Sequence, residues 1–287
     1  MKHTKKLIAL ITTLVLLLTT ATLTSQAKTP QYKKHVSFGD SVAVGFGPYN
    51  YTNRGFSRVD FAFPALVSDS LNAELVPLSR TGFRTQELRA MLDDTYKGDD
   101  YLFKLGKDIT PELISKYKPI FKQQAQQADL ITIQIGMNDA FALAKRKFEE
   151  NPNNTPLAVA EAIDAMWYGY TNFRENWDAI TGKLLQLNPN AKIIVVGMYN
   201  PIKEIKLTDV NLIKLGQAAD AITLAYNTYM QSQSKHADDY TYVDISDVEL
   251  FTQPAILTSG LDTTTIDVHP TKNGHKYIAQ QILKALN

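Results

Sequence analysis

His35-Val-Ser-Phe-Gly-Asp-Ser41 is the stretch that decides the fold, because it joins a short apolar strand to the start of a helix. Val36–Phe38 has the composition of a buried strand end, and Gly39 permits the sharp turn that follows. In open α/β sheets, a residue at such a junction lies at the carboxyl edge, where ligands bind. The stretch therefore predicts a parallel sheet with a serine hydroxyl presented at its carboxyl edge.

Five short apolar runs have the composition of strands that are buried on both faces. They are Val36–Phe38, Leu75–Leu78, Leu130–Ile135, Lys192–Met198 and Tyr240–Ile245. The helical patterns that separate or follow them are Phe61–Leu71, Asn172–Leu187, Ala218–Ser232 and Asn273–Leu286. This alternation predicts an α/β fold, in which helices cover both faces of a five-stranded parallel sheet through right-handed crossovers.

Three further blocks supply residues that could act together with the serine. One strand candidate ends at Gly82, a second is followed by Asn138, and His269 lies just before the last helix. A serine hydroxyl is a poor nucleophile at neutral pH and needs an adjacent base. Of the five histidines, His269 stands in a turn that Pro270 stiffens, so it is the candidate base.

Taken in order, these serine, glycine, asparagine and histidine blocks resemble the SGNH, or GDSL, hydrolase family, over residues 35–275. The resemblance implies a three-layer αβα, flavodoxin-like fold and an esterase or lipase-like acylhydrolase that forms an acyl-enzyme on Ser41. It also implies an oxyanion hole made of the backbone N–H groups of Ser41 and Gly82 and the side-chain amide of Asn138. We expect Asp40 and Asp139 to brace the surrounding loops through backbone hydrogen bonds.

The chain departs from the family pattern at the acid that orients the histidine. The family places this acid three residues before the histidine, where this sequence has Ile266. Asp267 lies two residues before His269, and Asp262 lies seven before it. If Asp267 reaches the far imidazole nitrogen, the site is a Ser-His-Asp triad. If a backbone carbonyl holds the imidazole instead, the site is a Ser–His dyad.

Residues 1–27 have the composition of a cleavable signal peptide. Met1–Lys6 is basic, Leu7–Leu23 is apolar with interspersed threonines, and small residues favour cleavage after Ala27. A retained membrane anchor is the alternative, although the run falls short of the ~20 consecutive apolar residues of a stable span. The chain has no cysteine, which excludes disulfides and a lipid-modified N-terminal cysteine. We therefore expect a secreted, bacterial type of protein with a single domain over 28–287.

Charge and motif content exclude several other classes of function. Cleavage after residue 27 removes three lysines and no acid, which leaves 27 basic and 29 acidic residues. Such a balance offers no basic surface for nucleic acid. The His-Glu-x-x-His, phosphate-loop and dinucleotide-binding motifs are all absent from the sequence. No metal, cofactor or obligatory protein partner is therefore expected, and the predicted ligand is a small-molecule, lipid or carbohydrate ester.

Two stretches, near 83–129 and 140–170, exceed what a minimal crossover needs. Both follow strands at the carboxyl edge, so we expect them beside the Ser41 cleft, where they could shape substrate access. Their aromatic residues could line a pocket for an acyl chain or a sugar, or could simply pack the insertions onto the domain. These residues are Tyr96, Tyr101, Phe103, Trp167, Tyr168 and Tyr170.

Two alternatives to a simple esterase are consistent with the sequence. The same active site could remove acetyl groups from cell-wall or other polysaccharides, or transfer acyl groups to them. The displaced acid before His269 also allows a catalytically silent binding protein of the same fold.

Overall fold

A five-stranded sheet forms the centre of the structure, and all of its strands run parallel. Its spatial order is β2-β1-β3-β4-β6. The bounds are β1 (Lys34–Gly39), β2 (Glu74–Ser79), β3 (Leu130–Gln134), β4 (Lys192–Val196) and β6 (Thr241–Val243). A separate parallel pair joins β5 (Lys206–Leu207) to β7 (Ile256–Leu257). All five expected strands of the central sheet are present.

The computed structural model describes residues 32–47, 54–96, 109–203, 205–237, 239–250, 256–257 and 269–287. Tyr32–Leu286 forms one compact unit. The predicted signal peptide lies outside the described residues. Within these ranges, no helix combines the length and the apolar character that crossing a membrane would require.

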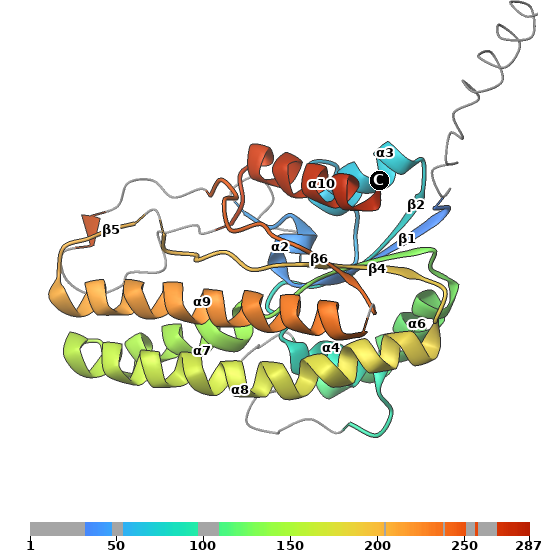
Figure 1. Ribbon diagram of the computed structural model, residues 1–287. Helices are drawn as coiled ribbons and strands as arrows, with labels where there is room; N and C mark the ends of the chain where they lie inside the picture. Colours follow the sequence, from blue (N-terminus) through green and yellow to red (C-terminus); the bar gives the residue numbers. More distant parts are fainter. Residues whose placement is uncertain are drawn as a thin grey trace, which may run out of the picture. The chain divides into compact units, whose positions relative to one another are not determined.

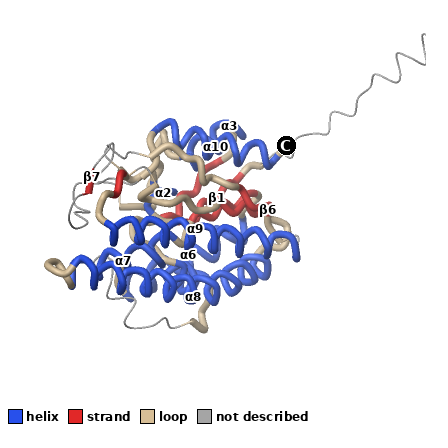
Figure 2. The backbone as a smooth tube through the Cα atoms, turned by 60° about the vertical axis from the view of Figure 1, so that its left-hand side comes forward, coloured by secondary structure: helices blue, strands red, loops and turns tan. Residues whose placement is uncertain are grey.

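Helices cover both faces of the sheet, as Figures 1 and 2 show from two directions. On one face, α3 (Phe63–Leu71) contacts α10 (Lys272–Leu286). The other face carries α4 (Thr85–Leu92), α6 (Pro111–Gln127), α7 (Met137–Glu150), α8 (Thr155–Leu187) and α9 (Val210–Ala237). The short helix α2 (Ser41–Val44) follows β1 directly. The architecture is therefore the expected three-layer αβα fold.

The sheet has the strand order of a flavodoxin-like fold, in which the second strand along the chain lies outside the first. In β1, Gly39 pairs with Ser79 of β2 on one side and with Gln134 of β3 on the other. Every residue of β3 is buried, as expected for a strand covered on both faces. The chain leaves β1 toward β2 on one side and later returns to β3 on the other. The carboxyl ends of β1 and β3 therefore form a topological switch point.

Where the structure describes them, the stretches predicted as insertions are largely helical. α6 begins after Thr110, whose hydroxyl accepts a hydrogen bond from the backbone N–H of Leu113, with Pro111 at the first helical position. Asn154 caps α8 in the same way by accepting from Leu157. The second stretch, near 140–170, comprises most of α7 and the first half of α8. The helix expected at Asn172–Leu187 therefore begins much earlier, at Thr155.

The aromatic residues of these stretches have mixed environments. Tyr170 packs against Tyr226 of α9, with ring centroids 5.1 Å apart. The guanidinium carbon of Arg89 in α4 lies 4.2 Å from the ring centroid of Tyr96. Trp167 and Tyr168 are 43% and 50% exposed. Tyr170 and Tyr96 therefore serve packing. Outside the described residues lie Tyr101 and Phe103.

A buried histidine joins the sheet to the α3 layer. The Nδ1 atom of His35 lies 2.7 Å from the Oγ of Ser68 in α3, and its Nε2 lies 2.8 Å from the Oγ1 of Thr132 in β3. Burial lowers the pKa of His35 to about 3, so the ring is neutral near neutral pH. His35 therefore acts as a polar link within the core.

Candidate active site

Ser41 lies at the switch point, just after a sharp turn. The turn begins at Gly39, where only glycine fits. An added Cβ on Gly39 would collide with the carbonyl oxygen of Gln134, because β1 and β3 approach closely there. The backbone N–H of Asp40 donates to the same oxygen at 3.1 Å. The carboxylate of Asp40 then accepts from the N–H of Val42 at 2.9 Å and caps α2. Ser41 is the first residue of this helix and is half-buried.

The structure brings His269 to this serine across 228 positions of sequence. The Nε2 of His269 lies 2.9 Å from the Oγ of Ser41, which is hydrogen-bond distance. The ring of Phe46, just after α2, meets the imidazole edge-on, with centroids 5.1 Å apart. Thr271 anchors the turn before α10 by donating its backbone N–H to the carbonyl of Glu249 at 3.0 Å. The contact with Phe46 and the anchored turn therefore hold the imidazole beside the serine hydroxyl.

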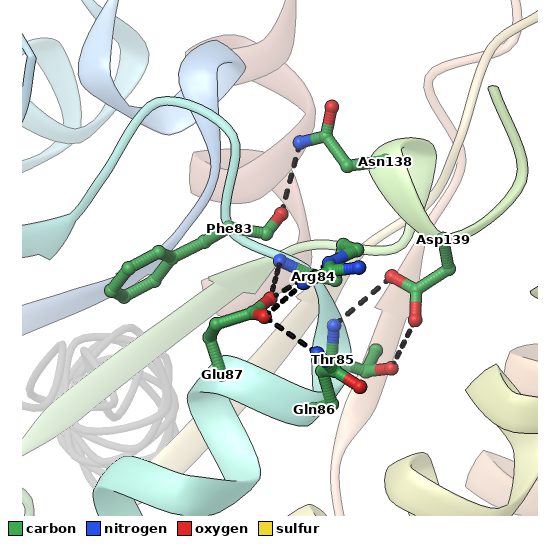
Figure 3. A network of polar contacts seen from close by, with 7 residues as sticks. All are labelled: Phe83, Arg84, Thr85, Gln86, Glu87, Asn138 and Asp139. Carbon is green, nitrogen blue, oxygen red and sulfur yellow. Dashed lines mark hydrogen bonds and ion pairs between the residues drawn. The ribbon is translucent and has the colours of Figure 1, made fainter. Parts of the chain in front are cut away.

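The segments that carry Gly82 and Asn138 also contact each other. Gly82 has a positive φ of 82°, and Gly136, before α7, has a φ of 126°, both of which favour glycine. The side-chain amide of Asn138 donates to the carbonyl of Phe83 at 2.9 Å. This contact engages one of the two N–H groups of that amide. Figure 3 shows the amide reaching the loop that follows Gly82 from the start of α7.

Asp267, the acid expected to orient His269, lies outside the described residues, as do Asp262 and Ile266. Its position relative to the imidazole therefore stays a prediction. Within the described ranges, no three His, Cys, Asp or Glu side chains are grouped as metal ligands.

A second histidine, His275 of α10, lies near the candidate site but in the core. The sequence places it among polar residues, yet it is fully buried, between the rings of Phe61 and Phe63. Its Nδ1 accepts a long hydrogen bond, 3.4 Å, from the backbone N–H of Phe63 at the start of α3. Burial lowers its pKa to about 3, with the nearby His269 as a smaller cause. Its polar neighbours in sequence, Lys272 and Asn273, are exposed, whereas His275 faces inward.

Sequence reasoning missed a buried polar network at the start of α4. Asp139 accepts hydrogen bonds from both the backbone N–H and the hydroxyl of Thr85. Beside them, Arg84 forms a buried ion pair with Glu87, which also accepts from the Nε2 of Gln86 at 2.7 Å (Figure 3). The available signal was a threonine three residues after Gly82 and an aspartate directly after Asn138.

Two buried carboxyl groups around the candidate site, those of Asp40 and Asp139, have strongly shifted pKa values. Burial raises the pKa of Asp40 to about 7, against the hydrogen bond from Val42 and with a smaller contribution from Asp139. Burial also raises the pKa of Asp139 to about 7, although its hydrogen bonds with Thr85 favour the charged form. Both carboxylates accept backbone N–H groups, as expected of residues that brace these loops.

Comparisons with known proteins show the family of this chain. A family model described as GDSL-like lipase/acylhydrolase matches residues 36–282. The chain belongs to this family. Family membership places it among ester-hydrolysing enzymes. A comparison with curated proteins gave no match.

Three of the solved structures similar to this GDSL family member are lipases or phospholipases. An extracellular lipase from Streptomyces rimosus aligns with a TM-score of 0.60 at 20% identity, covering 88% of this chain and 99% of that one. A phospholipase A1 from Streptomyces albidoflavus gives a TM-score of 0.56 at 18% identity, covering 88% and 99%. A lipase from a goat rumen metagenome gives 0.53 at 18%, covering 88% and 97%. At these identities the likeness shows a shared fold.

Exchanging Asp40 for asparagine should change how stability depends on pH. A pKa raised from 3.8 to about 7 means that the folded state holds a proton which the unfolded state has lost. The contribution of Asp40 is therefore full below about pH 4 and declines as the pH rises to about 7. In urea unfolding, the free energy of unfolding of Asp40→Asn should therefore rise relative to that of the wild type between about pH 4 and pH 7. Above about pH 7 the difference between the two proteins should stay constant.

Asp40→Ala is the matched control, because it removes the cap as well as the charge. It should unfold about 1 kcal/mol more easily than Asp40→Asn at every pH. A stability difference between Asp40→Asn and wild type that stays constant from pH 4 to pH 7 would contradict the assignment.

Proposed function

We propose that this chain is a serine esterase that cleaves carboxylic esters through an acyl-enzyme on Ser41. The observation that carries the proposal is the 2.9 Å contact between the Oγ of Ser41 and the Nε2 of His269. It lies at the carboxyl edge of the sheet, where α/β folds bind ligands. A serine hydroxyl within hydrogen-bond distance of an imidazole has beside it the base that it needs for nucleophilic attack.

In this mechanism His269 acts first as a base and then as an acid. The Oγ of Ser41 attacks the ester carbonyl carbon while its proton passes to Nε2 of His269. The tetrahedral intermediate collapses when the same proton moves to the leaving alcohol, which breaks the carbon–oxygen bond. Water then repeats the sequence on the acyl-enzyme, releasing the acid and restoring Ser41. The edge-on ring of Phe46 supports a fixed imidazole orientation.

The charge that develops on the carbonyl oxygen needs donors aimed at it. We assign these to the backbone N–H groups of Ser41 and Gly82 and to the side-chain amide of Asn138. The bond from Asn138 to Phe83 supports this role, since it engages one N–H of the amide and leaves the second for the substrate. A neutral amide also avoids placing a charge beside the nucleophile.

Asp267 is our candidate for the acid that orients His269. Its position two residues before the histidine supports this assignment. A carboxylate there would fix the imidazole tautomer and stabilise the imidazolium that forms during attack.

Export of the enzyme is the last part of the proposal. A basic start, an apolar run and small residues before Ala27 support a signal peptide over 1–27, followed by a single domain over 28–287. The substrate would then be a lipid, a small ester or an acylated carbohydrate outside the cell.

Replacing Ser41 with alanine should abolish hydrolysis of p-nitrophenyl acetate and of longer acyl esters, with kcat falling at least about 10⁴-fold. Asn138→Ala should lower kcat by about 10²–10³-fold with little change in KM, because its donor acts in the transition state. Ser70→Ala, which removes an exposed hydroxyl in α3, is the control. A folded Ser41→Ala enzyme that stays active would reject the proposal.

Asp267→Asn should keep the protein folded and lower kcat by up to about 10⁴-fold, because the imidazole loses its orienting charge. Asp262→Asn, seven residues before the histidine, is the matched control and should leave kcat unchanged. If Asp267→Asn retains wild-type turnover, a backbone carbonyl orients the ring and the site is a dyad.

Expression of the full chain in a bacterial host should yield secreted protein whose mass matches a chain that begins at Lys28. Mass spectrometry of the culture medium and of the membrane fraction checks this expectation. Full-length protein that is recovered only with membranes would instead support a retained anchor.

A further inference from the structure

The two oxyanion segments belong to strands that do not touch. The Gly82 segment follows β2 and the Asn138 segment follows β3, while β1 lies between these strands. Neighbouring strands lie about 4.8 Å apart, so the two segments leave the sheet about 10 Å from each other. No backbone ladder joins β2 directly to β3, and the pairing of each with β1 ends at Ser79 and Gln134. Contacts beyond the strand ends must therefore set the width of the proposed oxyanion hole.

Two consecutive residues of α7 make those contacts. Asn138 donates its amide N–H to the carbonyl of Phe83 at 2.9 Å. The carboxylate of Asp139 accepts the backbone N–H of Thr85 at 3.0 Å with one oxygen and the Thr85 hydroxyl with the other. Figure 3 shows the two side chains holding Phe83 and Thr85 along the same stretch of backbone. The start of α7 is thus hydrogen-bonded to the loop that follows Gly82 at two positions, Phe83 and Thr85.

The Thr85 contact adds to the N-terminal cap of α4, where Glu87 already accepts the backbone N–H of Arg84 at 2.8 Å. The first N–H groups of a helix have no partner within it. Arg84, at the N-cap position, has a guanidinium that can donate but cannot accept. Asp139 provides the acceptor from another helix, and its negative charge suits the positive end of α4. The contact therefore joins the two helices at the Thr85 N–H, while Glu87 of α4 accepts the N–H of Arg84.

The surroundings of Asp139 hold it in place. Its side chain is buried, and α8 presses on its backbone: an added Cβ on Gly169 would collide with the carbonyl oxygen of Asp139. The charged and titratable groups that act on it come from three elements besides α7. They are Arg84 and Glu87 of α4, Asp40 before α2, and Tyr226 of α9.

We infer that Thr85 and Asp139 are positioning residues that set the distance between the Gly82 and Asn138 donors. This inference rests on the proposed function. An oxyanion donor works within about 2.7–3.1 Å of the developing charge, and misplacement by 1 Å can cost about 10²-fold in rate. Loosening the contact should therefore lower kcat and leave KM nearly unchanged, because the lost interaction forms in the transition state.

The first test removes only the hydroxyl donor. Thr85→Val keeps the side-chain shape and should lower kcat about 10-fold, with KM within about 2-fold of wild type. Thr85→Ser restores the hydroxyl and should recover the rate. Thr181→Val is the control for general destabilisation, because its hydroxyl bonds the carbonyl of Trp177 within α8.

The second test changes the acceptor. Asp139→Asn should keep most of kcat, since its amide can accept from the Thr85 N–H and donate to the Thr85 hydroxyl. Asp139→Ala can do neither and should lose about 10²-fold in kcat. Thermal unfolding of each variant gives the folded fraction, to which every rate is corrected.

A boronic acid provides a readout that a merely structural role would not move. Its boron accepts the Oγ of Ser41 while the hydroxyl proton passes to His269, which forms a tetrahedral adduct with an oxygen in the oxyanion hole. Its affinity should fall in Thr85→Val and Asp139→Ala by the same factors as kcat, while substrate KM stays constant.

Folded Thr85→Val and Asp139→Ala enzymes with wild-type kcat would overturn the inference. So would losses that Thr181→Val shares, or losses that leave boronic acid affinity unchanged. Activity that survives Ser41→Ala would instead refute the proposed function. The Thr85 and Asp139 variants keep Ser41, so their outcomes test only the positioning role.

Discussion

The position of β1 between β2 and β3 is the constraint on which the candidate site depends. A parallel sheet brings the carboxyl ends of its strands to one edge, so three neighbouring strands deliver Ser41, Gly82 and Asn138 to one place. Gly39 makes this possible, because any side chain there would collide with the backbone of β3. The fourth group, His269, arrives from the opposite end of the chain, where the turn before α10 holds it against Ser41.

The strands were predictable because each is a short apolar run bounded by turn residues, which is typical of a parallel strand buried on both faces. α4 was not predictable from periodicity. Several residues that it turns inward, including Gln86 and Glu87, are polar and buried in a network, so the expected apolar stripe is interrupted. α8 was underestimated for a related reason. Its first half, which includes the exposed Trp167 and Tyr168, packs beside α7 away from the part that Trp177 anchors in the core.

For the site, the order of the motifs carried more information than any one of them. Ser41 and His269 could be paired from sequence because the family resemblance supplied the long-range contact. Contacts without such a template could not be foreseen. Neither the bond from Thr85 to Asp139 nor the burial of His275 follows from local sequence, because each depends on which helix packs opposite. Local patterns give an element's direction and type, whereas its polar partners are set by tertiary packing.

The buried carboxylates show that stability is given up around the proposed chemistry. Asp40 and Asp139 have pKa values raised to about 7, so at higher pH the fold carries two unfavourable negative charges close together. An apolar residue at either position would avoid that penalty but could not accept a backbone N–H. Asp40 holds the turn that presents Ser41, and Asp139 holds the loop that follows Gly82. The two carboxyl groups therefore fix backbone segments just beyond the ends of the strands, and the apolar core elsewhere must offset the cost of burying them.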